Sequence, residues 1–155
     1  MFRLLIVWLM IAIMAAITAT LVVNHAFAAQ SRYAVAKSMI GLKEGTSKAN
    51  KLMGVNTRAT PWCGYFVKAT LRPGRKPPTN FASGAGWTSW GTPVKLSSIA
   101  KGDVVTVYSA PARSKRHVGV YSHKQGGKVC LISGNSKNAV RVGCYPASRV
   151  KAIRR

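Results

Sequence analysis

Acidic side chains are almost absent from this sequence. Glu44 and Asp103 are its two carboxylates, against 24 Lys and Arg residues, and the formal net charge is +22. A glycosidase of the usual kind needs two carboxyl groups flanking one sugar bond, which would use every acid in the chain. Calcium cages and two-metal phosphoesterase sites need several oxygen ligands, so they are disfavoured on the same ground.

The chain is also short. Its 155 residues have room for one modest domain and one hydrophobic core. So basic a domain is expected to have an acidic polymer as its partner, either nucleic acid or the anionic surfaces of a bacterial envelope. The basic residues recur along the whole chain rather than in one block, which favours a solvated basic surface.

The amino terminus distinguishes between these partners. An uncharged run covers residues 4–23, and the Ala-x-Ala pattern that ends at Ala28 fits the site at which signal peptidase cuts. The run is longer than the roughly 7–15 residues of a secretory signal and near the roughly 20 that span a bilayer. We therefore interpret residues 1–28 as a cleaved signal peptide or a retained signal anchor, with transient membrane association through residues 4–23. Either segment exports residues 29–155 to the periplasm or cell wall, so no nucleic-acid partner is expected.

Hydrophobic periodicity predicts an α+β fold in a single domain over residues 29–155. Helical spacing of apolar residues predicts helices over residues 31–40 and 63–71, with one helical turn over residues 50–53. Short runs rich in Val and Tyr, bounded by turn residues, predict four strands, over residues 103–108, 117–122, 128–133 and 139–145. Helices followed by short strands indicate helices packed on an antiparallel sheet.

Cys63 has the position expected of a nucleophile. It begins a predicted helix, where unpaired backbone N–H groups lower the pKa of a thiol. A base must lie within hydrogen-bond reach, and beyond the amino-terminal segment the chain offers only His117 and His123. Alternation along the strand places His117 on the face opposite its valines, and we expect the His117 face to turn toward the helix of Cys63. His123 follows in a segment with the composition of a turn, which indicates a solvated loop histidine.

The imidazole of such a pair needs a group that fixes its tautomer. With so few acids in the chain, a neutral amide is the candidate. Asn135 follows the strand that we expect to return beside His117. From its spacing alone, however, Asn135 is better interpreted as a turn residue of the hairpin between the last two strands.

The three cysteines leave one unpaired in an exported chain. If the last hairpin pairs Ile132 with Val142, the same register sets Cys130 opposite Cys144, and a cross-strand disulfide would leave Cys63 free. Two buried thiols of unsuitable geometry are the alternative. A zinc site is not expected, because the sequence contains no CxxC or HxxxH spacing.

Five motifs, in this order, resemble one known group of enzymes. They are Thr60-Pro-Trp-Cys-Gly-Tyr-Phe-Val67, Trp87-x-x-Trp90-Gly, Gly102-Asp-Val-Val105, His117-Val-Gly-Val-Tyr121 and Gly134-Asn-Ser-x-Asn-Ala-Val140. Together they are similar to bacterial and phage peptidoglycan hydrolases of the NlpC and CHAP type, which are small relatives of papain. The resemblance covers residues 33–154 and implies a papain-like fold, with amino-terminal helices on a small antiparallel sheet.

The resemblance also implies a site and a reaction. It assigns Cys63 as the nucleophile, His117 as the base and Asn135 as the orienting residue, although CHAP-type enzymes often carry an acid where this chain has Ser133. The implied substrate is bacterial peptidoglycan, cleaved at an amide or peptide bond without metal or organic cofactor. We expect a monomer, either a phage endolysin or a bacterial remodelling enzyme.

Two other functions remain open at this point. A noncatalytic cationic protein on the same scaffold would bind anionic envelope surfaces through its charge alone. A membrane-disrupting cationic protein is less favoured, because the charges beyond the amino-terminal segment form no amphipathic helical stripe. The presence of both Cys63 and His117 favours the enzyme.

Overall fold

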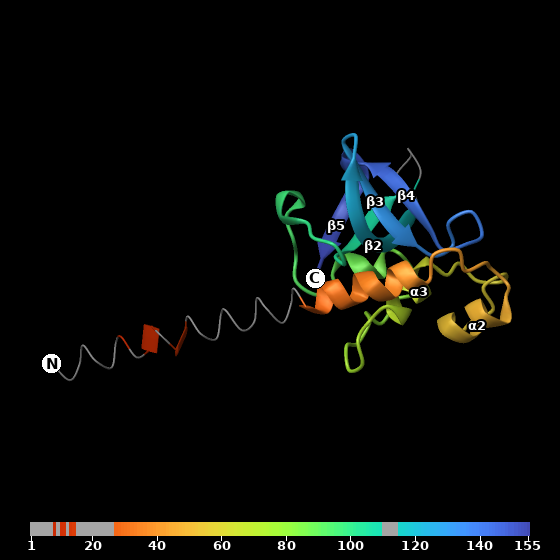
Figure 1. The fold of residues 1–155 in the computed structure, drawn as a ribbon, viewed down its shortest axis with the longest axis horizontal. Helices are drawn as coiled ribbons and strands as arrows, with labels where there is room; N and C mark the ends of the chain where they lie inside the picture. The colour runs from red at the N-terminus through yellow and green to blue at the C-terminus, as the bar shows by residue number, and fades with distance from the viewer. Residues whose placement is uncertain (1–7, 9, 12, 15–26, 110–114) are drawn as a thin grey trace.

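The computed structural model describes residues 8, 10, 11, 13, 14, 27–109 and 115–155 of the chain (Figure 1). The predicted signal peptide or anchor, with its uncharged run over residues 4–23, lies almost wholly outside the described residues. Within the described ranges, no helix is both long and apolar enough to cross a membrane. From residue 27 onward the chain has the α+β organisation that the sequence predicts.

Three helices lie before the sheet in the sequence from residue 27 onward: one over residues 27–38, α2 (Ser47–Met53) and α3 (Cys63–Ala69). The first was predicted over residues 31–40. It ends earlier because the chain turns at Gly41, which has a φ of +90° and donates its N–H to the Val140 carbonyl. α3 begins at Cys63 as predicted.

The helix over residues 27–38 is packed firmly against the rest of the domain. Ala29 is only 2% exposed, so the predicted cleavage point between residues 28 and 29 falls within a packed helix. The buried Arg32 guanidinium donates a hydrogen bond to the carbonyl of Gly102 and lies 5.2 Å from the ring centroid of Trp90. The hydrogen bond from Arg32 fixes the position of this helix against the turn that precedes the first strand.

Five antiparallel strands form one sheet in the order β4-β3-β2-β1-β5. Their bounds are β1 (Val104–Tyr108), β2 (Arg116–Gln125), β3 (Lys128–Ser133), β4 (Arg141–Pro146) and β5 (Val150–Arg154). Four of them lie within a few residues of the predicted strands, whereas β5 was not predicted. β2 continues to Gln125, so the prediction of a loop histidine at His123 is wrong: the residue lies in the strand opposite Cys130, although it is exposed.

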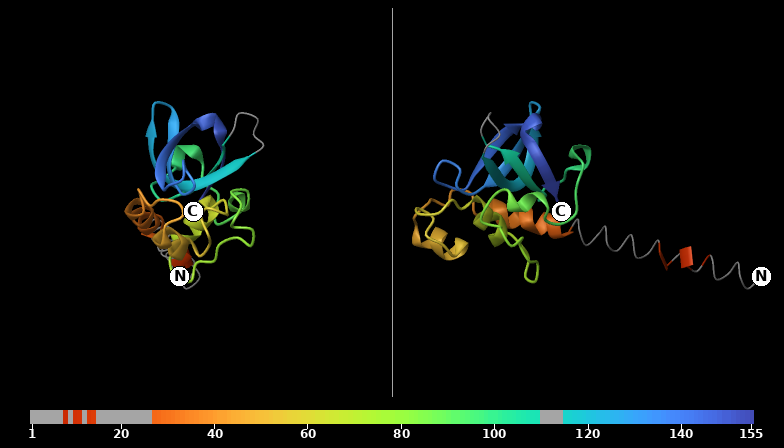
Figure 2. Two further views of the ribbon diagram at one scale, coloured as in Figure 1. Left: turned by 90° about the vertical axis from the view of Figure 1, so that its right-hand side faces the viewer. Right: turned by 180° about the vertical axis from the view of Figure 1, so that it is seen from behind.

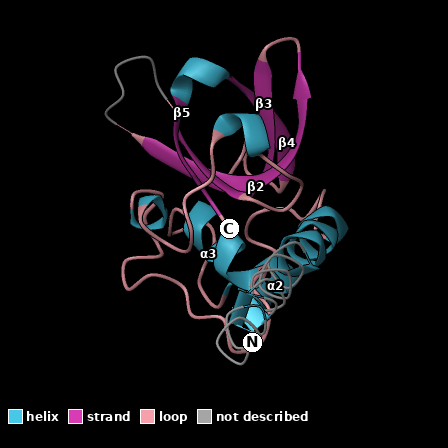
Figure 3. Ribbon diagram, turned by 90° about the vertical axis from the view of Figure 1, so that its left-hand side faces the viewer, coloured by secondary structure: helices cyan, strands magenta, loops and turns pink. Residues whose placement is uncertain are grey.

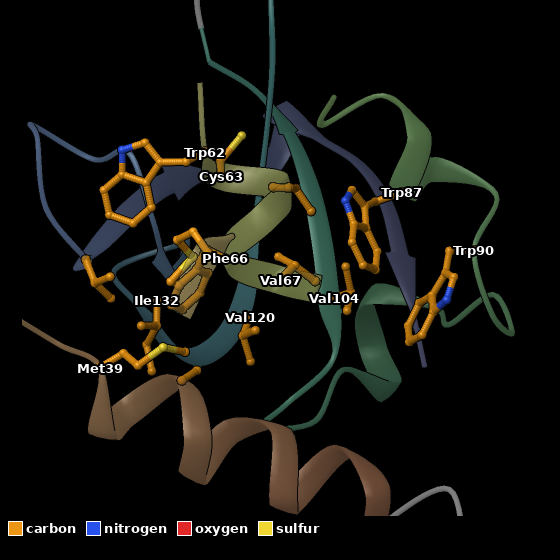
Figure 4. Close-up of a cluster of buried hydrophobic side chains, with 14 residues drawn as sticks. Met39, Trp62, Cys63, Phe66, Val67, Trp87, Trp90, Val104, Val120 and Ile132 are labelled. Atoms are coloured by element: carbon orange, nitrogen blue, oxygen red, sulfur yellow. The ribbon is translucent and has the colours of Figure 1, made fainter. Parts of the chain in front are cut away.

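The sheet is strongly curved, and both of its faces are covered (Figures 2 and 3). The face toward the helices carries the larger core, which includes Trp62, Phe66, Val67, Val104, Val118, Val120 and Ile132. Figure 4 shows this cluster around α3. The opposite face carries a second core of Val105, Val107, Tyr121, Val129, Leu131 and Ile153. The position of a residue along each strand therefore decides which core its side chain enters.

The hairpin of β3 and β4 has the register on which the disulfide prediction depended. Ile132 lies opposite Val142, and Cys130 lies opposite Cys144. A disulfide joins Cys130 and Cys144, with their Cα atoms 4.0 Å apart. Cys63 is the free cysteine, so the structure has one of the two arrangements that the sequence left open, a cross-strand disulfide with one free thiol.

Candidate active site

Cys63 is the first residue of α3, at the end of the helix where backbone N–H groups have no partner within the helix. Its side chain is buried and 6% exposed. Burial raises the pKa of the thiol, while hydrogen bonds from the backbone amides of Val118 and Gly64 act in the opposite direction. Because burial is the larger influence, the thiol is uncharged in the free protein at neutral pH.

His117 lies near the start of β2, opposite Val107 of β1. It is 9% exposed, and its Nε2 atom is buried without a hydrogen-bond partner among the described residues. Burial lowers the pKa of the imidazole to about 4. The ring is thus neutral at neutral pH, with Nε2 free to exchange a proton.

Two other groups lie near both the thiol and the imidazole. The amide that reaches the sulfur belongs to Val118, the residue directly after His117. The ring centroids of His117 and of Tyr145, which is on β4, are 6.0 Å apart. Burial raises the pKa of the Tyr145 hydroxyl most, and the nearby Cys63 thiol raises it further. The first turn of α3, the start of β2 and β4 therefore meet in one place. Tyr145 was not singled out from the sequence. The registers of β2 with β3 and of β3 with β4 together place it on the same face as His117.

The orientation of His117 differs from the expectation. The alternation along β2 is confirmed, but Val118 and Val120 pack against α3, while the register with Val107 places His117 on the opposite face. The expectation that the His117 face turns toward the helix is therefore wrong for the body of α3. Cys63 is near this site because it is the terminal residue of the helix. In the described part of the chain no hydrogen bond joins the two side chains.

Asn135 lies in the connection between β3 and β4, with a φ of 56°. This agrees with its interpretation as a turn residue, and the residue lines a polar pocket beside Glu44 and Pro61. Its predicted role in orienting the imidazole remains a prediction. Ser133 is a second candidate for that role, because it is fully buried and lies beside Gly119 on the His117 face. Its Oγ has no hydrogen-bond partner in the described part of the chain.

The two acids of the chain have different environments. Asp103 is fully buried and pairs with Arg155, whose Nε lies 2.8 Å from Oδ1, so it is a structural residue. Glu44 accepts a hydrogen bond of 3.0 Å from the indole N–H of Trp62, the residue before Cys63. One acid therefore stabilises the fold, and the other lines a polar pocket and contacts the residue before Cys63.

Three residues of the types that bind metal ions also lie together, although the sequence spacing indicated no metal site. The ligand atoms of His123, Cys130 and Cys144 lie within 4.8 Å of one another, because the three residues lie side by side on adjacent strands. Both cysteines are joined in the disulfide, so neither thiolate is available to a metal ion.

Comparison with known proteins assigns the chain to no family. No family model matches it, and no curated protein matches it. The class that the fold defines is an α+β domain with a five-stranded antiparallel sheet. Its chemistry must be inferred from the geometry of the residues around Cys63.

Proposed function

We propose that this chain is a cysteine hydrolase with a papain-like NlpC/CHAP scaffold, which cleaves an amide bond of bacterial peptidoglycan. One observation carries the proposal: a free, buried thiol begins a helix and contacts the amide next to a buried histidine, whose Nε2 has no partner among the described residues. A nucleophile and a base are the two groups that acyl transfer requires. The order of sequence motifs around Cys63 and His117 supports the same class.

In the proposed reaction the resting pair is uncharged. The Cys63 Sγ–H proton moves to His117 Nε2 as sulfur attacks the substrate carbonyl carbon, and the backbone N–H of Cys63 donates to the oxyanion. The C–N bond breaks as Nε2 returns the proton to the leaving nitrogen. Water then adds to the thioester, which yields a carboxylic acid and restores the thiol. The cycle balances without metal or organic cofactor.

The proposed substrate rests on charge and on the predicted export. A net charge of +22 favours an anionic polymer, and peptidoglycan carries carboxylates in its stem peptides. If charge concentrates the enzyme on the wall, raising the ionic strength to about 0.15 M shortens the screening length to about 8 Å and weakens binding to walls. Turnover of a small soluble stem peptide should change little.

The test measures amine release and turbidity loss from purified walls, together with hydrolysis of a soluble stem peptide. Cys63→Ser and His117→Gln should each reduce turnover by about 10³-fold or more, and the double variant should lose no more than the stronger single variant. His123→Gln, the same kind of change at an exposed histidine of the same strand, is the matched control and should keep full activity. Full activity in either site variant would refute the proposal.

The same experiment tests which residue orients the imidazole. Ser133→Ala should reduce turnover if the buried hydroxyl contacts the ring during catalysis, whereas Asn135→Ala should do so if the amide has that role. A change in the pH profile of kcat, rather than of stability alone, identifies the orienting residue.

A noncatalytic envelope-binding protein is the second candidate. It is favoured by the absence of a hydrogen bond between Cys63 and His117 in the described residues and by the neutral state of both groups. Such a protein would bind walls with the same affinity after Cys63→Ser and would release no amine from them. Cysteine-dependent amine release would exclude it.

A further inference from the structure

Glu44 is unusual because, among the residues that the structure describes, its carboxylate has no ion-pair partner. The chain contains 24 Lys and Arg residues, and Asp103 is already paired with Arg155. In the described residues no cationic side chain is paired with Glu44. Glu44 is therefore the one carboxylate of the chain that is available to a positively charged ligand.

The carboxylate is held in place by its neighbours. The indole N–H of Trp62 donates to Oε2 at 3.0 Å, and the backbone N–H of Glu44 donates to the carbonyl of Asn138 at 2.9 Å. An isolated bridge between Lys43 and Ala139 joins the same two segments. With Oε2 occupied, Oε1 remains free to accept hydrogen bonds, so the site is ordered before any ligand arrives.

The carboxylate lines a polar pocket with a volume of about 280 Å³, whose other lining residues are Thr57, Arg58, Ala59, Thr60, Pro61, Asn135 and Asn138. Asn135 and Asn138 supply amide groups to the lining, and Arg58 supplies a guanidinium. Both Asn residues belong to a loop in which Asn135, Lys137 and Asn138 have φ values of 56°, 50° and 60°. Left-handed backbone at non-glycine residues is costly and is concentrated at ligand sites, so the loop conformation agrees with a binding role.

The pocket is close to the thiol. Pro61 lies two residues before Cys63, so their Cα atoms are separated by at most about 7 Å. Figure 4 shows the indole of Trp62 and the sulfur of Cys63 extending in different directions from adjacent residues, so that one backbone segment serves both the pocket and the nucleophile. Because an extended peptide spans about 7 Å in two residues, a peptide that presents a carbonyl to the sulfur is long enough to place a neighbouring residue in the pocket.

We infer that this pocket is a substrate subsite for a free primary ammonium group, such as that of a diamino acid in a stem peptide. An ammonium has three donors and no acceptor, which matches the free Glu44 oxygen, and the guanidinium of Arg58 in the same lining suits the carboxylate of such a diamino acid. The strongly basic surface repels cations at long range, so the local carboxylate must supply the preference. The inference rests on the proposed peptidoglycan hydrolysis for its substrate, but its binding test needs no catalysis.

The test uses the full chain with Cys63→Ala, so that no peptide is consumed. Calorimetry measures binding of the tripeptide N-acetyl-L-Ala-γ-D-Glu-L-Lys, whose one ammonium is that of the Lys side chain, and of the same peptide with that amine acetylated. The free amine should bind about tenfold or more tightly, since a hydrogen bond between charged groups is lost on acetylation. Equal affinity of the two peptides for the otherwise unchanged pocket would overturn the inference.

Glu44→Gln provides the second arm. The amide oxygen still accepts from Trp62, so folding should be preserved, and the preference for the free amine should fall to about one. Ser148→Lys is the matched control, because it raises the net charge by the same one unit at an exposed position and should keep the preference. An unchanged preference in Glu44→Gln, checked for a native unfolding midpoint, would also overturn the inference.

The outcomes separate this inference from the proposed function. An amine preference that depends on Glu44, without hydrolysis by the unmodified chain, would retain the subsite and refute the hydrolase. Cysteine-dependent hydrolysis of both peptides without any preference in binding would retain the hydrolase and refute the subsite.

Discussion

The buried, uncharged His117 makes the stability of the folded protein sensitive to acid. Burial lowers the pKa of its imidazole from 6.5 to about 4. Between these values the unfolded chain takes up a proton at His117 while the folded chain does not, so protonation favours unfolding. The stabilisation is fully present above pH 6.5 and is lost as the pH falls toward 4.

The size of this loss follows from the two pKa values. Relative to pH 8, linkage gives about 1.4 kcal/mol lost at pH 5.5 and about 3 kcal/mol lost at pH 4. A small domain has a total stability of about 5–15 kcal/mol, so the loss is a large part of it. The effect should therefore be visible in ordinary denaturation curves.

The assay is urea unfolding at pH 8, 5.5 and 4, followed by tryptophan fluorescence. His117→Gln replaces the imidazole with a group that does not titrate. Between pH 8 and pH 4, the free energy of unfolding of the unmodified chain should therefore fall by about 3 kcal/mol more than that of the variant. His123→Gln removes an exposed histidine and should retain the part of the loss that belongs to His117. Parallel pH profiles for His117→Gln and the unmodified chain would refute the buried, neutral imidazole.

Three further changes test other parts of the structure. In the folded chain at pH 7, iodoacetamide should modify Cys63 more slowly than in urea, because burial raises the pKa of the thiol. Mass spectrometry without reductant should find one modified cysteine per chain, since the other two form the disulfide. Rapid modification of the folded chain would contradict this. Gly134→Ala would put a Cβ 2.5 Å from the nearest atom of the indole beside it and should cost about 1–3 kcal/mol in urea unfolding, whereas Gly143→Ala, with its nearest neighbour at 3.4 Å, should cost little. Arg155→Met should lower the free energy of unfolding by about 3 kcal/mol in the same assay, since it leaves the buried Asp103 carboxylate without its cation. An unchanged unfolding midpoint would show that the ion pair is dispensable.

The order of elements was predictable because local patterns carry it. The predicted bounds of β3 are those observed, and the helix that begins at Cys63 was located from its apolar face and the Pro-Gly that follows it. β5 was missed because its five residues, Val150–Arg154, include two basic side chains and no alternating pattern. Its conformation depends on pairing with β1, where Val105 lies opposite Ile153, and the intervening chain gives no local indication of that contact.

The position of the disulfide could be predicted from one assumed strand pairing. Once Ile132 was set opposite Val142, the period of two along each strand placed Cys130 opposite Cys144, and the structure has that register. The metal-ligand cluster with His123 could not be found in the same way. It requires the pairing of β2 with β3 as well, including a register shift before His123.

The sequence by itself determined the charge, the α+β class and the place of Cys63 at the start of a helix. Each follows from composition or from a periodicity within a few residues. The tertiary structure alone decided which face of β2 meets α3, that Tyr145 contacts His117, and that Glu44 rather than Asp103 lines a pocket. These features depend on contacts between residues far apart in the chain. Alternation along a strand assigns residues to two faces, but only the packing of other elements decides what each face contacts.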